Sequence, residues 1–295
     1  MQLKSYLALV TATLCWGGNA VAGKLAVGHV SPMVLTFNRW SLAMVIVLAV
    51  ATPQIRRDWP VIRRHLPLLA LYGIIGYTVF NALLYSALEY TGAINVAIAQ
   101  AGIPMLIFLL NFALFATRVS LLQIAGFGLT LVGVALTAAH GDLGSLLRLD
   151  VNFGDLLMLF AVAAYALYAV ILRYKPAIDW KSLMAIPALA ALLSSAPLAV
   201  WETQAGTAIW PDATGWAVCL YTGIFASLVA QVCFIIGVEG LGANRAGLFI
   251  NLVPVFGTLL SVTLLGEALQ LYHVAALVLA LGGIAIAESG KAKAR

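Results

Sequence analysis

Long apolar runs recur along the whole chain and restrict what it can fold into. An α-helix needs about 20 apolar residues to cross a hydrocarbon core about 30 Å thick, and each run is close to that length. We place ten runs, at residues 5–27, 32–53, 66–88, 92–116, 121–139, 152–173, 181–201, 213–238, 243–265 and 270–289. Only 9% of the residues are charged, whereas soluble domains carry about a quarter. These features exclude a water-soluble domain.

The runs also limit the secondary structure. In lipid, backbone N–H and C=O groups must be satisfied within the protein, so the spanning structures are α-helices and closed β-barrels. A barrel needs segments of about ten residues that alternate between apolar and polar side chains, and the runs here do not alternate. We therefore predict an all-α integral membrane protein with ten transmembrane helices.

One stretch of the sequence occurs twice, 150 residues apart. At this offset the matched pairs are Glu89 with Glu239, Gly92 with Gly242, Ala93 with Ala243, Pro104 with Pro254 and Gly133 with Gly283. We divide the chain into a first five-helix repeat at 1–140, an extracytoplasmic linker at 141–151 and a second five-helix repeat at 152–295. Because five is odd, the second repeat enters the membrane from the opposite side, and the two repeats are predicted to be inverted relative to each other.

The Lys and Arg residues of the predicted loops lie almost all on one side of the membrane. That side holds Lys4, Arg56, Arg57, Arg63, Arg64, Arg118, Arg173, Lys175, Lys181, Arg245, Lys291, Lys293 and Arg295, and the opposite side holds only Arg148. Since short cytoplasmic loops are enriched in Lys and Arg, both termini are predicted to be cytoplasmic. The basic residues form no continuous patch with aromatic residues, so we expect the lipid bilayer, and not nucleic acid, as a partner.

Two cations lie well inside the predicted spans. Arg39 is about 10 Å from the start of its helix by the helical rise, and Lys24 lies near the end of the first span. An intramembrane charge is costly and usually faces the protein interior or a water-filled cavity. No Asp or Glu lies equally deep, which favours an anionic or zwitterionic solute whose carboxylate meets the cations. The alternatives are that Lys24 reaches back to the interface and that Arg39 bonds to helix-end carbonyls or to Asn38.

Aromatic and amide side chains form stripes on several spans. On the third span Tyr77, Asn81 and Tyr85 recur at helical spacing, and the 150-residue offset places Gln231 at the position equivalent to Asn81. The candidate substrate-binding residues are Trp16, Asn19, Tyr77, Asn81, Tyr85, Gln100, Tyr165, Tyr168, Gln231 and Asn251, with Lys24 and Arg39 as candidate charged contacts. Amides also hold membrane helices together, so helix packing is the alternative role.

Two prolines, Pro104 and Pro254, occupy matching positions in the fourth and ninth spans. Proline removes a backbone hydrogen bond and bends a helix, and the freed carbonyl then needs a partner or lines a cavity. Gln100 and Asn251 each precede a proline within one turn, where their amides can reach those carbonyls or a solute. We interpret both prolines as candidate gating hinges, although bends also occur in static bundles.

No pattern typical of an enzyme is present. His29, His65, His140 and His273 are scattered over loops and span ends, so neither a metal site nor a His-based catalytic site is predicted. The three cysteines lie inside spans without Cys-x-x-Cys spacing. The complete Gly-x-x-x-x-Gly-Lys-[Ser/Thr] pattern of a phosphate-binding loop is missing, because the run from Gly18 to Lys24 has this spacing but is followed by Leu25, which argues against an ATP-driven pump. We expect no catalytic residue, no metal and no cofactor.

Several short motifs occur in a characteristic order. These are Trp16-Gly17-Gly18-Asn19 with Lys24, Arg39, the two Glu-x-x-Gly-Ala motifs that begin at Glu89 and Glu239 and are each followed by a proline, and Gly266-Glu267. With this order the whole chain resembles the ten-helix EamA family of the drug/metabolite transporter (DMT) superfamily. In the first repeat the position that matches Gly266-Glu267 is Ala116-Thr117, which departs from the symmetry.

The resemblance implies two inverted five-helix repeats around a central cavity, and efflux of metabolites across a bacterial inner (plasma) membrane. Within the family the chain is similar to the branch that exports aromatic and other neutral amino acids. The leading hypothesis is therefore a secondary transporter that exports small zwitterionic metabolites, above all such amino acids, by alternating access.

Other functions stay open at this point. Transport of organic anions, phosphorylated sugars or drugs is the alternative, and for the anions and sugars Lys24 and Arg39 would be the primary ligands. A membrane receptor or a membrane-embedded enzyme is the remote alternative. The fifth and tenth spans are rich in glycine and poor in polar groups, which suits helix packing or contact with a second copy, so a homodimer is a further candidate.

Overall fold

A computed structural model describes residues 2–115, 120–142, 152–242, 246–247 and 249–291 of the chain. Within these residues every regular element is a helix. The first half contains α1 (Gln2–Ala26), α2 (Pro32–Ile62), α3 (Leu66–Tyr72), η1 (Gly73–Val79), α4 (Phe80–Tyr90), α5 (Ala93–Ala99), η2 (Gln100–Gly102), α6 (Ile103–Phe115) and α7 (Leu121–Ala138). The second half contains α9 (Phe153–Ile171), η3 (Leu172–Tyr174), α10 (Trp180–Gln204), α11 (Ala213–Leu220), η4 (Tyr221–Val229), α12 (Ala230–Leu241), α14 (Leu252–Leu260), η5 (Ser261–Leu265) and α15 (Leu271–Lys291).

Most of these helices are suited to a bilayer. Among the described residues, eight helical stretches are long and apolar enough to cross a membrane. The 25-residue α1 and the shorter apolar stretch Leu252–Leu265 occupy the two remaining predicted spans. The prediction of an all-α membrane protein is confirmed. Most of the predicted linker lies outside the described residues, and the division at 141–151 stays a prediction.

The helix α2 is longer than the predicted span: the span is predicted to end at residue 53, and the helix continues to Ile62. Its extension is held against the start of α10. The carboxylate of Asp58 accepts hydrogen bonds from Asp179 N and Ser182 Oγ, both at 2.8 Å. The apolar pattern of a sequence marks only the part of a helix that lies in the hydrocarbon. It therefore does not predict a helical extension outside the membrane that polar contacts stabilise.

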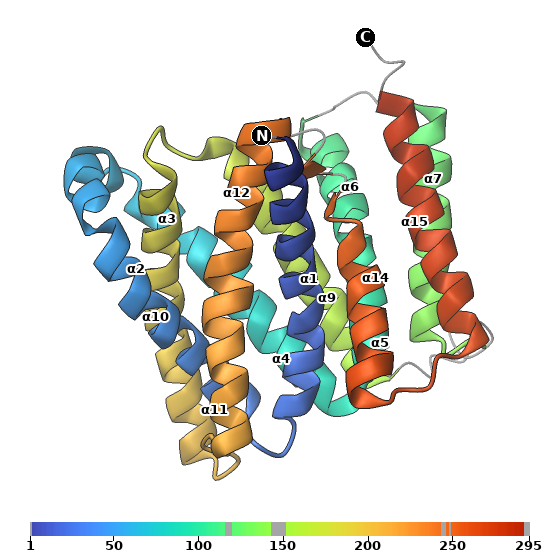
Figure 1. Ribbon diagram of the computed structural model, residues 1–295, viewed down its shortest axis with the longest axis horizontal. Coiled ribbons are helices and arrows are strands. Elements are labelled where there is room, and N and C mark those ends of the chain that lie inside the picture. The colour runs from blue at the N-terminus through green and yellow to red at the C-terminus, as the bar shows by residue number, and fades with distance from the viewer. Residues whose placement is uncertain (1, 116–119, 143–151, 243–245, 248, 292–295) are drawn as a thin grey trace.

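The bundle has two faces, which we name by the chain ends. At the terminal face α1 begins and α15 ends, and at the distal face α1 ends and α15 begins (Figure 1). Helices of the two halves pack as equivalent pairs: α2 with α10, α5 with α14, and α7 with α15. In the same way α1 packs against η4 and α12, while its counterpart α9 packs against η1 and α4. The π-helical η1 coincides with the last seven residues of η4 after a shift of 150 residues. This exchange of partners indicates a two-fold relation between the halves.

Small residues allow α7 and α15 to pack closely at one end of the bundle (Figure 1). A Cβ on Gly126 or on Gly283 would overlap the carbonyl oxygen of the other. Between them, Thr130 Oγ1 lies 3.3 Å from the Ala280 carbonyl oxygen. Such close approach is what small residues provide in membrane helices. Gly126 and Gly283 therefore pack against each other within one chain.

Buried apolar clusters lie toward both faces of the bundle. A large buried apolar cluster includes Val34, Leu88 and Ala93, which lie near the distal ends of α2, α4 and α5. By contrast α6, which runs to the terminal face, has no buried residue. A cavity of about 530 Å³ near this end is lined by Asn111, Ala169, Val170, Leu172, Arg173 and Lys175. The terminal face therefore combines an open groove beside α6 with a buried apolar cluster of Ile62, Leu69, Tyr72 and Ile186.

Candidate substrate-binding site

Arg39 of α2 lies at the centre of a buried polar cluster, with only 6% of its surface exposed. Its Nη1 lies 2.9 Å from Asn19 Oδ1, 2.8 Å from Asn81 Oδ1 and 2.5 Å from the Tyr85 hydroxyl. Its Nε donates to Ser227 Oγ at 2.8 Å. The cluster therefore joins α1, α2 and α4 of the first half to η4 of the second half.

Two of the acceptors are oriented by hydrogen bonds of their own. Asn81 Nδ2 donates to the Tyr77 carbonyl oxygen at 2.5 Å, so the Oδ1 atom of Asn81 faces Arg39. The Tyr85 hydroxyl donates to Asn19 Oδ1 at 3.0 Å, which leaves its oxygen free to accept from the guanidinium. A guanidinium only donates hydrogen bonds. These bonds therefore turn the acceptor oxygens of Asn81 and Tyr85 toward Arg39, as the cation requires.

The charge of Arg39 is not neutralised by an acid. Within the part of the chain that the structure describes, Arg39 forms no ion pair with Asp or Glu, and its second terminal nitrogen, Nη2, has no hydrogen-bond acceptor. A buried charge without a counterion costs several kcal/mol, and neutral oxygens offset only part of this. A carboxylate that binds at Nη2 would gain a charge-assisted hydrogen bond.

A row of aromatic rings leads from Arg39 toward α9. The Trp40 and Tyr77 rings stack with centroids 4.6 Å apart and planes 6° apart. Tyr77 lies 5.8 Å from Tyr168, which lies 5.4 Å from Tyr165, both between ring centroids. Arg39 Cζ is 5.3 Å from the Trp40 ring. Aromatic faces accept apolar groups and cations, so the row offers such a surface beside the guanidinium.

Two glycines of η1 bring this row against the second half. A Cβ on Gly76 would overlap the Tyr168 ring, and a Cβ on Gly73 would overlap the Pro187 carbonyl oxygen. The segment is π-helical, a rare geometry that occurs frequently at functional sites. The local sequence thus allows the contact between η1, α9 and α10 that positions Tyr77.

The structure brings Arg39, Asn19, Asn81 and Tyr85 together, and it places Tyr77, Tyr165 and Tyr168 in the adjoining aromatic row. Sequence reasoning missed Trp40 and Ser227. A signal for Ser227 was available, because it lies 150 residues after Tyr77 and so occupies the equivalent position in the second half.

Other predicted residues lie apart from this cluster. Trp16 Nε1 donates to the Ala226 carbonyl oxygen at 3.1 Å. Gln100 is half-buried and bonds within its own helix, to the Val96 carbonyl at 3.3 Å. Gln231 and Asn251 are half-buried, and their side chains form no hydrogen bond with the described residues.

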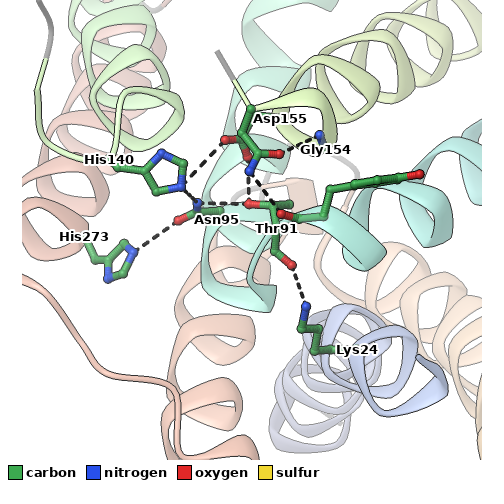
Figure 2. Close-up of polar contacts among 9 residues, drawn as sticks. Lys24, Thr91, Asn95, His140, Gly154, Asp155 and His273 are labelled. Carbon is green, nitrogen blue, oxygen red and sulfur yellow. Dashed lines mark hydrogen bonds and ion pairs between the residues drawn. The ribbon is translucent and has the colours of Figure 1, made fainter. Parts of the chain in front are cut away.

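Lys24 has partners of its own, distinct from those of Arg39. Its ammonium group donates to the carbonyl oxygens of Leu88 and Thr91, at 2.8 and 2.9 Å (Figure 2 shows the Thr91 contact). These carbonyls lie at the end of α4, where a cation is favoured by the helix dipole. Lys24 therefore stabilises a helix end at the distal face.

Both prolines lie just after a break in their helix. Pro104 is the second residue of α6, which follows the 3₁₀ segment η2. Pro254 is the third residue of α14, which follows a turn at residues 250–251. A proline in the first turn of a helix loses little, because its missing N–H has no partner there anyway. The chain thus restarts a helix at each proline, and a gating role for these breaks stays a prediction.

Three acids of the second half contact the first half at the distal face. Glu202 Oε2 accepts from Ser31 Oγ at 2.6 Å and from Val34 N at 3.1 Å. Glu267 Oε1 and Oε2 accept from the N–H groups of Ala93 and Ile94 at 2.8 and 2.9 Å. Carboxylates at helix starts are stabilising, because the first N–H groups lack partners. These contacts fasten the starts of α2 and α5 to the other half.

The third acid is Asp155, which accepts from Thr91 Oγ1 at 2.9 Å. The expected absence of acids therefore holds only for the middle of the spans. Glu202 and Asp155 are buried near helix ends.

The expectation that the histidines are scattered is wrong for one pair. His140 and His273 both contact Asn95, at 3.3 and 3.1 Å. They are far apart in the sequence and meet because α7 ends where α15 begins. Among the described residues, no group of three or more His, Cys, Asp or Glu is placed to hold a metal ion.

Comparison with known proteins identifies the family. The profile of the EamA-like transporter family matches residues 3–139 and again 152–288. The chain belongs to the EamA-like transporter family. It is therefore a multi-pass membrane transporter, and each half of the chain contains one copy of the family domain.

Similar transporters occur in bacteria and archaea. YyaM of Bacillus subtilis, described as an uncharacterized transporter, is 25% identical over 97% of this chain and 94% of its own length. YetK of the same organism, with the same description, is 25% identical over 96% of this chain and 86% of its own. A transporter of Archaeoglobus fulgidus is 25% identical over 96% of this chain. One solved protein structure matches all of both chains with a TM-score of 0.66 and 22% identity, which shows a shared fold.

Proposed function

We propose that this transporter exports small zwitterionic metabolites, with aromatic and other neutral amino acids as the favoured substrates. The observation that carries the proposal is the free Nη2 of the buried Arg39, which has no acid partner among the described residues. A solute carboxylate would complete this site by accepting a charge-assisted hydrogen bond from Nη2.

The surroundings of Arg39 favour a zwitterion with an apolar side chain. The stacked rings of Trp40 and Tyr77 form an apolar surface next to the guanidinium. Such rings also attract an ammonium group through their faces.

Alternating access is supported by the two-fold pairing of the helices, and polar contacts between the halves lie at both faces. The distal face is fastened by Glu202 and Glu267, which reach from one half to the other. The terminal face contains the cavity near Arg173. With the basic loops in the cytoplasm, the termini are cytoplasmic, the membrane is a bacterial inner membrane and this state is closed to the outside.

Organic anions are the competing substrate class, because a single buried cation also suits them. They would gain more from a second cation, and Lys24 is already bonded to two carbonyls. The neutral rings and amides around Arg39 therefore favour the zwitterion.

Exchange in proteoliposomes tests the proposal. Vesicles loaded with one unlabelled solute are given the same solute in labelled form, for a panel of neutral amino acids, organic anions and organic cations. We expect accumulation of an aromatic or neutral amino acid. Accumulation of organic anions alone would show that the substrates are anions and not zwitterions. Accumulation of cations alone would contradict the role of Arg39.

A further inference from the structure

A second polar cluster lies at the distal face, away from Arg39, and Asp155 is its buried acid (Figure 2). The Asp155 side chain is 7% exposed. Its Oδ1 accepts from Thr91 Oγ1 at 2.9 Å, while its Oδ2 is buried and has no hydrogen-bond donor among the described residues. Among the described residues, the basic atom within 4.0 Å of Oδ2 is His140 Nε2.

The hydrogen bonds of the cluster fix which atoms carry hydrogen. Gln270 N donates to His273 Nδ1 at 3.0 Å, so the His273 ring proton is on Nε2. That Nε2 donates to Asn95 Oδ1 at 3.1 Å, which fixes the amide of Asn95. Asn95 Nδ2 then donates to Thr91 Oγ1 at 3.1 Å and to His140 Nε2 at 3.3 Å. His140 Nε2 is therefore an acceptor, and its ring proton is on Nδ1.

Two acceptor atoms thus face each other with no hydrogen between them. A buried carboxylate oxygen without a donor is costly. A proton on His140 Nε2 would turn the 4.0 Å contact into an ion pair, and a movement of the half-exposed ring toward Oδ2 would let this proton form the missing hydrogen bond. The His140 side chain is 48% exposed, so water at the distal face can deliver the proton.

The other titratable groups around the pair come from several elements. Among the described residues they include Tyr90 at the end of α4, Lys24 of α1 behind the Thr91 carbonyl, Asp142 after α7, Glu267 before α15, and Tyr272 and His273 within α15. Lys24, Glu267 and His273 already have hydrogen-bond partners. Asp155 Oδ2 and His140 Nε2 are left as the acceptors that a single proton can bridge.

We propose that Asp155 and His140 form a proton-binding site, and that the proton bound there is the coupling ion of transport. The coupling part rests on the proposed function. The mechanism follows from Asn95, because a proton shared by Asp155 and His140 competes with the Asn95 amide for His140 Nε2. Asn95 belongs to α5, the helix whose start is fastened by Glu267. A proton from the distal side also alters a contact between the two halves, because Asp155 belongs to the second half and His140 to the first.

Infrared difference spectroscopy of the purified protein in lipid nanodiscs tests the site without any substrate. On acidification we expect a protonated-carboxyl band that is lost in Asp155→Asn and kept in Asp212→Asn, which changes an exposed acid at the same face. His140→Gln, at a half-exposed position, should shift the midpoint of this band by about one pH unit or more. An unchanged band in Asp155→Asn would overturn the proposal.

Transport assays test the coupling separately. In proteoliposomes a pH gradient should accelerate solute movement, and this acceleration should fall about tenfold or more in Asp155→Asn while Asp212→Asn keeps it. If the pH gradient does not change the rate of solute transport by the unmodified protein, the coupling is overturned. If no solute moves at all, the proposed function fails, and the infrared result still decides whether the proton site exists.

Discussion

Arg39 Nη1 donates a hydrogen bond of 2.8 Å to Asn81 Oδ1, so a buried cation of α2 is held by a neutral amide of α4. The amide holds the guanidinium in place and leaves its charge uncompensated. An acid at position 81 would fix the same side chain and cancel the charge. The neutral residue therefore keeps Arg39 available to an anionic group of a solute.

Changing this amide to an acid should separate stability from transport. In Asn81→Asp the new carboxylate pairs with Arg39, and a hydrogen bond to a charged group exceeds a neutral one by about 1 kcal/mol. We expect a higher thermal unfolding temperature. We also expect uptake of the carboxylate-bearing solute to fall by about tenfold or more, since a loss of about 1.4 kcal/mol weakens binding tenfold. Uptake at the unmodified rate, measured in the same vesicles, would contradict the role of Arg39.

Removing a carboxylate at the distal face should open that face. Glu267→Gln weakens two charge-assisted bonds to the start of α5, which are worth about 1–3 kcal/mol together after solvent competition. Cys219 is fully buried near this face, so its reaction with an impermeant thiol reagent reports opening. We expect faster labelling of Cys219, located by peptide mass spectrometry. The matched control is Glu239→Gln, an exposed acid near the terminal face, and equal labelling in both variants would argue against the distal fastening.

Two glycines of one helix should respond oppositely to a methyl group. A Cβ on Gly126 would overlap the Gly283 carbonyl, whereas a Cβ on Gly128 meets no atom within 4 Å. Overpacking costs about 1–3 kcal/mol, so Gly126→Ala should lower the unfolding temperature in detergent and Gly128→Ala should leave it unchanged or raise it. Equal damage in both variants would mean that the face of α7 that bears Gly128 is also packed, for example against a second copy.

The stability contribution of Asp212 should be lost only in acid. The N–H group of Gly215 and the hydrogen bond from His29 lower the pKa of Asp212 below its ordinary value of 3.8. A lowered folded-state pKa gives stability that is complete above the unfolded value and disappears as the pH falls through the folded value. The difference in unfolding temperature between the unmodified protein and Asp212→Ala should therefore be the same at about pH 5 and at neutral pH. A difference that already shrinks between these pH values would show that Asp212 titrates there and is no neutral control for Asp155.

Local patterns predicted much of this molecule. Runs of apolar residues are long enough to mark the helices, and the helical spacing of Tyr77, Asn81 and Tyr85 placed them on one face. That face meets Arg39 in the folded protein. The 150-residue offset predicted the equivalent halves, because it is a property of the sequence alone.

Contacts between distant segments were not predictable in this way. Glu202 and Glu267 stabilise helix starts that lie 168 and 173 residues away in sequence, so their partners depend on which helices become neighbours. Lys24 was placed as a candidate solute contact because a buried charge suggests function, and the carbonyls at the end of α4 that it meets depend on tertiary packing. The pairing of His140 with His273 through Asn95 has the same origin.

The most direct test of the account is exchange by Arg39→Gln. A neutral amino acid is compared with its carboxamide, which keeps the side chain and the ammonium group and lacks the carboxylate. Arg57→Gln is the control, because the Arg57 side chain is 66% exposed and pairs with Asp58 and Asp179 on α2 and before α10. We predict that the unmodified protein and Arg57→Gln exchange the amino acid and discriminate against the carboxamide, while Arg39→Gln loses exchange of the amino acid by about tenfold or more. Exchange by Arg39→Gln at the unmodified rate, with the same discrimination, would contradict Arg39 as the carboxylate anchor.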